Sequence, residues 1–151
     1  MRDMKKLLLI SLLIIGCNNN TNTNQSEELT LSAEEYIEIG DSLFLEERKY
    51  APAIREYNKA IKLDPNRWGV YIDRGYAKYL LDDFKGAEAD YTYVINNFVN
   101  LGDNWFLEEA YSERGMLREE LGNMKGACQD WKKGAELGDE LAAEWYDESC
   151  Y

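Results

Sequence analysis

The sequence of 151 residues contains no histidine, only two prolines and only three cysteines. Without histidine, the chain lacks the usual general base of Ser/His and Cys/His catalytic pairs and the imidazole ligands of many zinc sites. Positive charge is also scarce, because 17 Lys and Arg stand against 29 Asp and Glu, for a net charge of −12. An acidic chain repels phosphate backbones, so we expect no nucleic-acid partner.

A long apolar run is missing as well. The stretch Leu7–Ile15 is broken by Ser11 and is shorter than the roughly 17 to 25 residues that a membrane-spanning helix needs. It follows three basic residues, and this charged-then-apolar order is typical of a secretory signal. We therefore expect residues 1–16 to be a signal segment, with a permanent anchor helix as the less favoured alternative.

The residues after the apolar run indicate where the chain is held. Ile14–Cys17 resembles the bacterial lipobox, in which the cysteine is acylated and becomes the new N-terminus. Ile15 departs from the pattern, because this position more often holds a small residue. The resemblance implies a lipoprotein signal peptide, lipidation of Cys17 and a lipid anchor in the membrane of a bacterial cell envelope. The alternative is an ordinary signal followed by a chance cysteine.

Residues 17–31 follow the signal and are expected to form a flexible tether. Asn18–Ser26 contains only Asn, Thr, Gln and Ser, and such a segment cannot bury enough apolar area to offset the entropy of ordering. Glu27 lies ten residues past Cys17, too far to resemble the acidic surface-export tags of some lipoproteins. A periplasm-facing position is therefore favoured over the cell surface.

The rest of the chain contains a threefold internal repeat, over residues 33–66, 67–100 and 104–138. In each copy an aromatic residue precedes a glycine by four positions, and a later alanine precedes a second aromatic residue by four positions. This spacing of i and i+4 places both members of a pair on one face of a helix. Each copy is thus predicted to form two helices. The glycines are Gly40, Gly75 and Gly115, and the alanines are Ala53, Ala87 and Ala127.

This pattern resembles the tetratricopeptide repeat (TPR), a helix-turn-helix family with a 34-residue period. The first copy matches most fully, through Tyr36, Gly40, Ala53, Tyr57, Ala60 and Pro65. The later copies have Val94 and Gly134 where the family prefers alanine, and Gly126–Gly138 looks like the related Sel1-type variant. The resemblance implies an all-α domain over residues 32–151: a short α-solenoid of three repeats closed by a C-terminal capping helix at 139–150, with seven helices in all.

Three pairs of side chains, one of cysteines and two of opposite charge, are predicted to link the helices. If Cys17 is lipidated, Cys128 and Cys150 remain, and a hairpin that turns near Gly138 would bring them close together. An exported compartment permits a disulfide between them, and two free thiols are the alternative. Arg74 with Asp90, and Arg114 with Asp130, are each sixteen residues apart at equivalent places in two copies. We expect an ion pair between the two helices of each of these repeats, with solvated charges as the alternative.

In the resembled family, the first helix of each pair lines a concave face that binds extended or helical peptides. Carried over by position, that face forms an apolar strip rimmed by carboxylates, which suits a basic peptide with a hydrophobic anchor. The alternative is that its aromatic residues belong to the core. The residues concerned are Glu34, Ile37, Asp41, Phe44, Ile72, Tyr76, Tyr79, Glu109, Ser112, Met116 and Glu119.

The family's clamp for a C-terminal carboxylate uses Lys, Arg and Asn at these places. This chain has the opposite chemistry there, so we do not expect a ligand of that kind. The positions that depart from the clamp are Ile37, Asp41, Asp73, Glu109 and Glu113.

Catalytic, cofactor-binding and metal-binding residues are not predicted. The pairs Asp82-Asp83 and Glu108-Glu109 could serve as acid and base, but acidic pairs usually lie in solvated turns and helix ends. Calcium binding at Asp82-Asp83 or Asp103-Asn104 lacks a loop of alternating oxygen ligands. The favoured function is a membrane-tethered protein-interaction module, an adaptor or scaffold without a cofactor or small-molecule substrate. A structural subunit of an envelope assembly is the alternative, and a carboxylate-based enzyme is a remote one.

Overall fold

The structure is a computed structural model that describes residues 31–98 and 104–151. The predicted signal segment, the lipidation site at Cys17 and all but the last residue of the predicted tether lie outside these residues. Within them the chain forms seven α-helices and no strand, which confirms the predicted all-α class. The helices are α1 (Ala33–Leu45), α2 (Tyr50–Leu63), α3 (Trp68–Tyr79), α4 (Phe84–Asn97), α5 (Trp105–Glu120), α6 (Met124–Leu137) and α7 (Glu140–Ser149).

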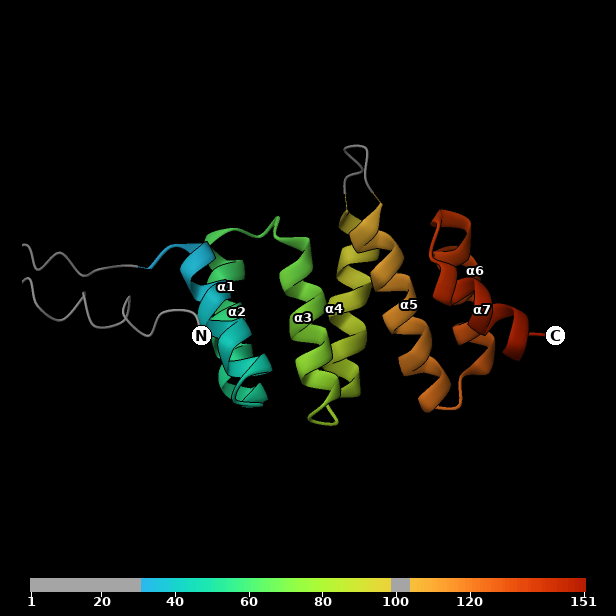
Figure 1. Cartoon of the computed structure of the whole chain (residues 1–151), viewed down its shortest axis with the longest axis horizontal. Coiled ribbons are helices and arrows are strands. Elements are labelled where there is room, and N and C mark those ends of the chain that lie inside the picture. The colour runs from blue at the N-terminus through green and yellow to red at the C-terminus, as the bar shows by residue number, and fades with distance from the viewer. Residues whose placement is uncertain (1–30, 99–103) are drawn as a thin grey trace, which may run out of the picture.

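The helices stack side by side in chain order and form an elongated row (Figure 1). Each packs against the next, and α3 also contacts α5 across the helix that separates them in sequence. The first helices of the three repeats are α1, α3 and α5, and α7 covers the end of the row. No helix within the described ranges is long and apolar enough to cross a membrane.

Helix boundaries follow local sequence signals. Ser32 and Glu35 form the capping box that begins α1, and α2 ends at Leu63, directly before Asp64 and a proline. The side chain of Asp139 accepts hydrogen bonds from two backbone N–H groups and so caps the start of α7. Short turns result, and these turns keep consecutive helices close and antiparallel.

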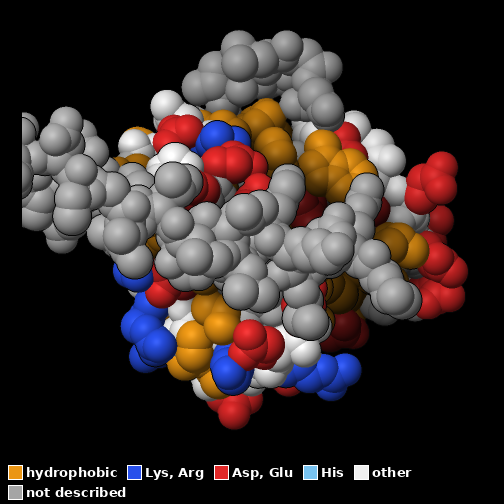
Figure 2. All heavy atoms as spheres, turned by 60° about the vertical axis from the view of Figure 1, so that its left-hand side comes forward, with side chains coloured by type: hydrophobic (Ala, Val, Ile, Leu, Met, Phe, Trp, Pro, Cys, Tyr) orange, Lys and Arg blue, Asp and Glu red, His pale blue; other side chains and the backbone are white. Residues whose placement is uncertain are grey.

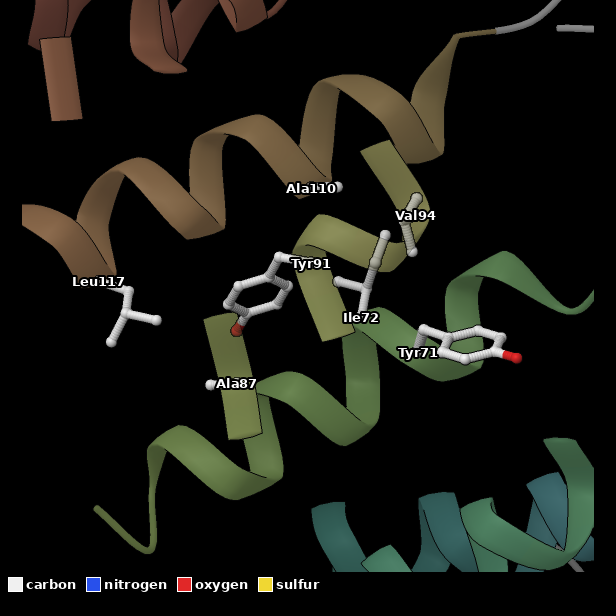
Figure 3. Close-up of a cluster of buried hydrophobic side chains, with 7 residues drawn as sticks. All are labelled: Tyr71, Ile72, Ala87, Tyr91, Val94, Ala110 and Leu117. Atoms are coloured by element: carbon white, nitrogen blue, oxygen red, sulfur yellow. The ribbon is translucent and has the colours of Figure 1, made fainter. Parts of the chain in front are cut away.

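The core of each repeat is built where a helical glycine meets an aromatic ring. Gly40 faces Tyr57, Gly75 faces Tyr91 and Gly115 faces Trp131, and all three rings are almost fully buried. In the middle repeat, Tyr91 and Ile72 lie in one cluster supplied by α3, α4 and α5 (Figure 3). The glycine lets the two helices of a pair approach until the ring fills the space between them. This contact explains the aromatic and glycine spacing of the repeat.

The predicted ion pairs are present and reach further than one repeat. Arg74 donates two hydrogen bonds to the carboxylate of Asp90, at 2.9 and 2.5 Å, and Arg114 donates two to Asp130, at 2.9 and 2.7 Å. Each arginine also reaches the second helix of the preceding repeat: Arg74 donates to Asn58 at 2.6 Å, and Arg114 to Thr92 at 2.9 Å. One side chain therefore ties three helices together.

A second cation joins each of these buried carboxylates. Lys78 donates to Asp90 at 2.8 Å, and Arg118 donates to Asp130 at 2.8 Å. Arg118 also pairs with Glu88 of the preceding repeat at 2.9 Å. The positive charges of Lys78 and Arg118 are thus used in contacts within the solenoid.

The capping helix α7 is fixed by packing and by a covalent bond. Ala142 is buried on the third repeat, and the ring of Trp145 lies 5.9 Å from that of Trp131. In the structure, Cys128 and Cys150 form a disulfide with an S–S distance of 2.05 Å and a sequence separation of 22. A loop of this length stabilises the folded state by about 3 kcal/mol in the chain-entropy model. The disulfide therefore holds α7 against α6.

Candidate functional site

The candidate site is the surface made by α1, α3, α5 and α7, called the groove below. Each first helix places a carboxylate there at the same position, two residues after the repeat's first tyrosine: Glu38, Asp73 and Glu113. The negative charge of Asp41 acts on Asp73, and the charges of Glu109 and Asp139 act on Glu113. A row of mutually repelling carboxylates therefore runs along the groove. Its members are Asp41, Asp73, Glu109, Glu113 and Asp139.

Burial, together with this crowding of charge, raises the pKa of carboxyl groups in the row. Desolvation, followed by the charges of Asp41 and Glu109, raises the pKa of Asp73 to about 7. Asp73 is exposed to solvent at the surface of the groove. Desolvation and the charge of Glu109 likewise raise the pKa of Glu113 to about 7. Near neutral pH, the negative charge of the groove therefore changes with pH.

Two adjoining pockets hollow the groove. The first, the tyrosine pocket, has a volume of about 160 Å³ and lies between α3 and α5. Its walls are mostly aromatic and apolar: Tyr76, Tyr79, Tyr91, Met116 and Leu117, with Glu113 at one side.

The second, the cap pocket, has a volume of about 360 Å³ and lies between α5 and α7. It shares Glu113 with the tyrosine pocket, so the two adjoin. It combines two tryptophans with five carboxylates. Its lining is Trp105, Glu108, Glu109, Ser112, Glu113, Gly138, Asp139, Glu140, Leu141 and Trp145.

Cations are absent from this lining. Among the described residues that form the two pockets there is no Lys or Arg. In one space-filling view, acidic side chains gather along the right-hand edge, while most Lys and Arg side chains lie toward the lower part (Figure 2). Four of the Lys and Arg side chains pair instead with the buried carboxylates of Asp90 and Asp130. The carboxylates of the two pockets thus face one another without a positive neighbour in the lining.

Several residues predicted for the groove do line it. Tyr76, Tyr79 and Met116 line the tyrosine pocket, and the ring of Phe44 lies 5.7 Å from that of Tyr76. Ser112 lines the cap pocket and donates a hydrogen bond to Asp139. These residues indicate a continuous surface from α1 to the cap.

Other predicted residues lie elsewhere. Ile72 is only 3% exposed and belongs to the buried cluster of the middle repeat, where Figure 3 shows it. This burial corrects the assignment of Ile72 to the groove, because its side chain is not available to a ligand. Ile37 packs against the core of the first repeat, and Glu119 lines neither pocket. Asp41 stays in the groove, where it accepts a hydrogen bond of 2.9 Å from the hydroxyl of Tyr57.

Glu34 and Asp41 mark the N-terminal end of the groove. Glu34 pairs with Arg67 at 2.9 Å, so its charge is compensated. Asp41 lines a separate pocket of about 290 Å³ on α1, together with Glu38. The larger group of carboxylates without a Lys or Arg beside them therefore lies in the cap pocket, at the C-terminal end of the groove.

Sequence reasoning did not find the tryptophan and cap residues of the site. Trp105, Asp139 and Trp145 line the cap pocket, although the pattern predicted residues 139–150 only as a cover for the last repeat. The acidic character of the groove could have been predicted from the repeat, because Glu38, Asp73 and Glu113 occupy the same position in the three copies. Within the part of the chain that the structure describes, no group of three or more His, Cys, Asp or Glu residues is arranged to hold a metal ion.

Comparison with known sequences yields relatives that are longer than this chain. It is 30% identical over 120 residues to Tetratricopeptide repeat protein 36 of Danio rerio, which covers 80% of this chain and 59% of that protein. It is 30% identical over 128 residues to RNA polymerase II-associated protein 3 of Xenopus laevis, covering 80% of this chain and 18% of that protein. The chain thus spans less than two thirds of either relative. No family model matches the sequence.

Solved structures agree with the helix arrangement. The first TPR of Spaghetti (RPAP3), bound to the HSP90 peptide SRMEEVD, superposes with a TM-score of 0.67 at 26% identity. That match covers 79% of this chain and 90% of the other. The chain has the tetratricopeptide-repeat fold. The second TPR domain of human RPAP3, in complex with the HSP70 peptide SGPTIEEVD, matches with a TM-score of 0.66 at 25% identity, over 79% of this chain and 95% of that one.

The TPR fold assigns the elements to repeats. Helix pairs α1/α2, α3/α4 and α5/α6 are the three repeats, and α7 follows them as the capping helix. The groove is therefore made by the first helix of every TPR pair together with the cap. The Sel1-type character of the last copy stays a prediction from the sequence.

Proposed function

We propose that the chain is a protein-interaction module whose groove binds a basic segment of a protein partner that also carries a hydrophobic anchor. The main support is that two pockets of different chemistry adjoin in the groove. One is aromatic, and the other is lined by five carboxylates; the described residues that line them include no Lys or Arg. Charge complementarity across an interface selects partners and speeds their association. An acidic groove with an aromatic floor favours a ligand that offers both positive charge and apolar area.

The comparisons support a binding role and sharpen the choice of ligand. Two structures with the same fold hold peptides that end in Glu-Glu-Val-Asp. The groove of this chain carries Asp73, Glu109 and Glu113, and these carboxylates would repel such a peptide. We infer that the groove has the same general use with the opposite charge preference.

A pair of peptides tests this preference in the full chain. We expect the charge-reversed peptide SRMKKVK to bind at least about tenfold more tightly than SRMEEVD in a fluorescence-anisotropy titration. Its affinity should fall between pH 8 and pH 6. As the pH drops through about 7, Asp73 and Glu113 take up protons and the groove loses negative charge. Equal affinities, or tighter binding of SRMEEVD, would overturn the proposal.

We also propose that the module is tethered to a bacterial membrane through lipidated Cys17, facing the periplasm. The support is the resemblance of Ile14–Cys17 to the lipobox and the polar composition of Asn18–Ser26. The change Cys17→Ser should move the chain from the membrane fraction to the soluble fraction of bacterial cells. The matched change Ser26→Ala should leave the fractionation as it is. Retention of the Cys17→Ser chain in the membrane fraction would contradict lipid anchorage.

A further inference from the structure

The two pockets of the groove differ in chemistry, and we propose that they are paired subsites for one bound segment. The cap pocket takes the ammonium or guanidinium group of a single Lys or Arg side chain. The tyrosine pocket takes an apolar side chain of the same segment, about three residues away. This assignment rests on the proposed function and adds to it the place of each ligand group.

The charge of the cap pocket is the first argument. Glu109 and Glu113 are four residues apart on α5, so both project from one face of that helix. Like charges at this spacing destabilise a helix. The negative charge of Asp139, at the start of the cap, also repels that of Glu113. A local arrangement that costs stability is expected at a functional site. A single cation placed between these groups would remove the repulsion.

The walls of the cap pocket are the second argument. The side chain of Trp105 is 61% exposed and lines the pocket from α5, while Trp145 lines it from α7. The indole of Trp105 also hydrogen-bonds to Glu109, which holds the ring next to a carboxylate. Tryptophan faces attract Lys and Arg cations more strongly than other aromatic faces do. Two indoles beside several carboxylates thus suit a cation on a long apolar stem.

The cap pocket is also well ordered. Asp139 accepts hydrogen bonds from the backbone N–H groups of Leu141 and Ala142, at 2.9 and 3.1 Å, and from the hydroxyl of Ser112. The disulfide Cys128–Cys150 fixes the helix that carries Trp145. A pocket whose side chains are already held in place loses little entropy when a ligand binds. The pocket is therefore formed before the ligand arrives.

The distance between the two subsites follows from the packing of the helices. The tyrosine pocket lies between α3 and α5, the cap pocket lies between α5 and α7, and Glu113 borders both. Packed helices are about 8 to 10 Å apart, so the pocket centres are separated by about one such step. A chain in the polyproline II conformation advances about 3.1 Å per residue and has about three residues per turn, so side chains three residues apart lie on the same side. The anchor and the cation are therefore about three residues apart in the bound segment.

A double-mutant cycle on the full chain tests the cation subsite. The probe is a fluorescein-labelled acetyl-Gly-Lys-Gly-Gly-Leu-Gly peptide, with one companion in which Gln replaces Lys. The double change Glu109→Gln and Glu113→Gln should weaken binding of the Lys peptide at least about tenfold and leave the Gln peptide nearly unchanged. The matched change Glu144→Gln, on the same cap but outside the pocket lining, should alter neither. Circular dichroism checks that each variant is folded.

A second set of probes tests the spacing and the anchor. Moving Lys next to Leu should weaken the peptide several-fold for the unaltered chain and leave the affinity for the double variant unchanged. The change Met116→Ser should weaken the Lys and Gln peptides by the same factor, because Met116 lines the tyrosine pocket and not the cap pocket. Loss of the dependence on spacing would overturn the paired subsites.

The outcomes separate this inference from the proposed function. If SRMKKVK still binds preferentially but the Lys peptide binds the double variant and the unaltered chain equally, the cation subsite is wrong and the basic preference stands. If SRMKKVK has no preference over SRMEEVD, the proposed function itself fails. Displacement of the Lys peptide by micromolar Ca²⁺ would assign the cap pocket to a metal ion, and this too would overturn the inference.

Discussion

Replacing Asp130 by alanine is expected to lower the free energy of unfolding by about 3–5 kcal/mol. The Asp130 carboxylate is only 3% exposed and accepts hydrogen bonds from Arg114 and from Arg118. Without it, the buried guanidinium of Arg114 keeps its contact with Thr92 but loses its counter-ion. An uncompensated buried charge is among the most destabilising changes that a single substitution makes. Urea unfolding of the full chain followed by circular dichroism gives the value.

The matched control is an exposed ion pair on the same helix. Glu136 pairs with Lys133 at 2.6 Å, three residues away on α6, and both side chains are open to solvent. The change Glu136→Ala should therefore leave the free energy of unfolding nearly unchanged, because a solvent-exposed pair contributes little. If Asp130→Ala and Glu136→Ala cost the same, the network around Asp130 does not hold the third repeat together. A changed slope of the unfolding curve would indicate that the compactness of the unfolded chain also differs.

The change Gly115→Ala is expected to destabilise the chain by a net of about 1–2 kcal/mol, because overpacking that costs up to about 3 kcal/mol exceeds the gain of about 1 kcal/mol in helix propensity. A Cβ atom at this position would lie 2.5 Å from Cδ1 of Trp131. That indole is only 1% exposed and is enclosed between α5, α6 and the cap, so it cannot turn aside. Overpacking therefore outweighs the gain in helix propensity. Thermal unfolding gives the loss as a lower Tm.

Gly69→Ala serves as the control for this prediction. Gly69 is also helical, but a Cβ atom there would meet only the ring of Phe106, at 3.0 Å. Phe106 is 36% exposed and has room to rotate. The cost of overpacking should then be roughly cancelled by the better helix propensity, and the net change should stay within about 1 kcal/mol. A loss as large as that of Gly115→Ala would show that close approach to a buried ring is not what matters.

Much of the fold was predictable because its contacts repeat. The glycine opposite an aromatic ring occurs three times, so its spacing stands out in the sequence and carries the helix pairs with it. The Arg74–Asp90 and Arg114–Asp130 pairs were predictable for the same reason, since both connect the two helices of one repeat at a fixed separation. Periodicity records contacts within a repeat well.

The site was harder to predict, because it forms between repeats. Ile72 occupies the position of Ile37 and Ser112, yet its exposure depends on how α3 meets α4 and α5. Trp105 and Trp145 come together only when α7 docks on the third repeat. Angles between neighbouring repeats and the placement of a single cap have no counterpart elsewhere in the sequence, so no spacing rule reports them. Tyr76, Tyr79 and Met116 were found because a resemblance to TPR domains supplied that geometry.

The arginine links between repeats also bear on how such a chain could be lengthened. The second helix of one repeat offers an acceptor, Asn58 or Thr92, and the first helix of the next offers the arginine that uses it. Ile39 takes the arginine's place in the first repeat, so that repeat has no link to make with a predecessor. The middle repeat has both halves of the link. It is thus the one unit that could be duplicated in tandem with matching junctions on either side, which would extend the groove while keeping both ends as they are.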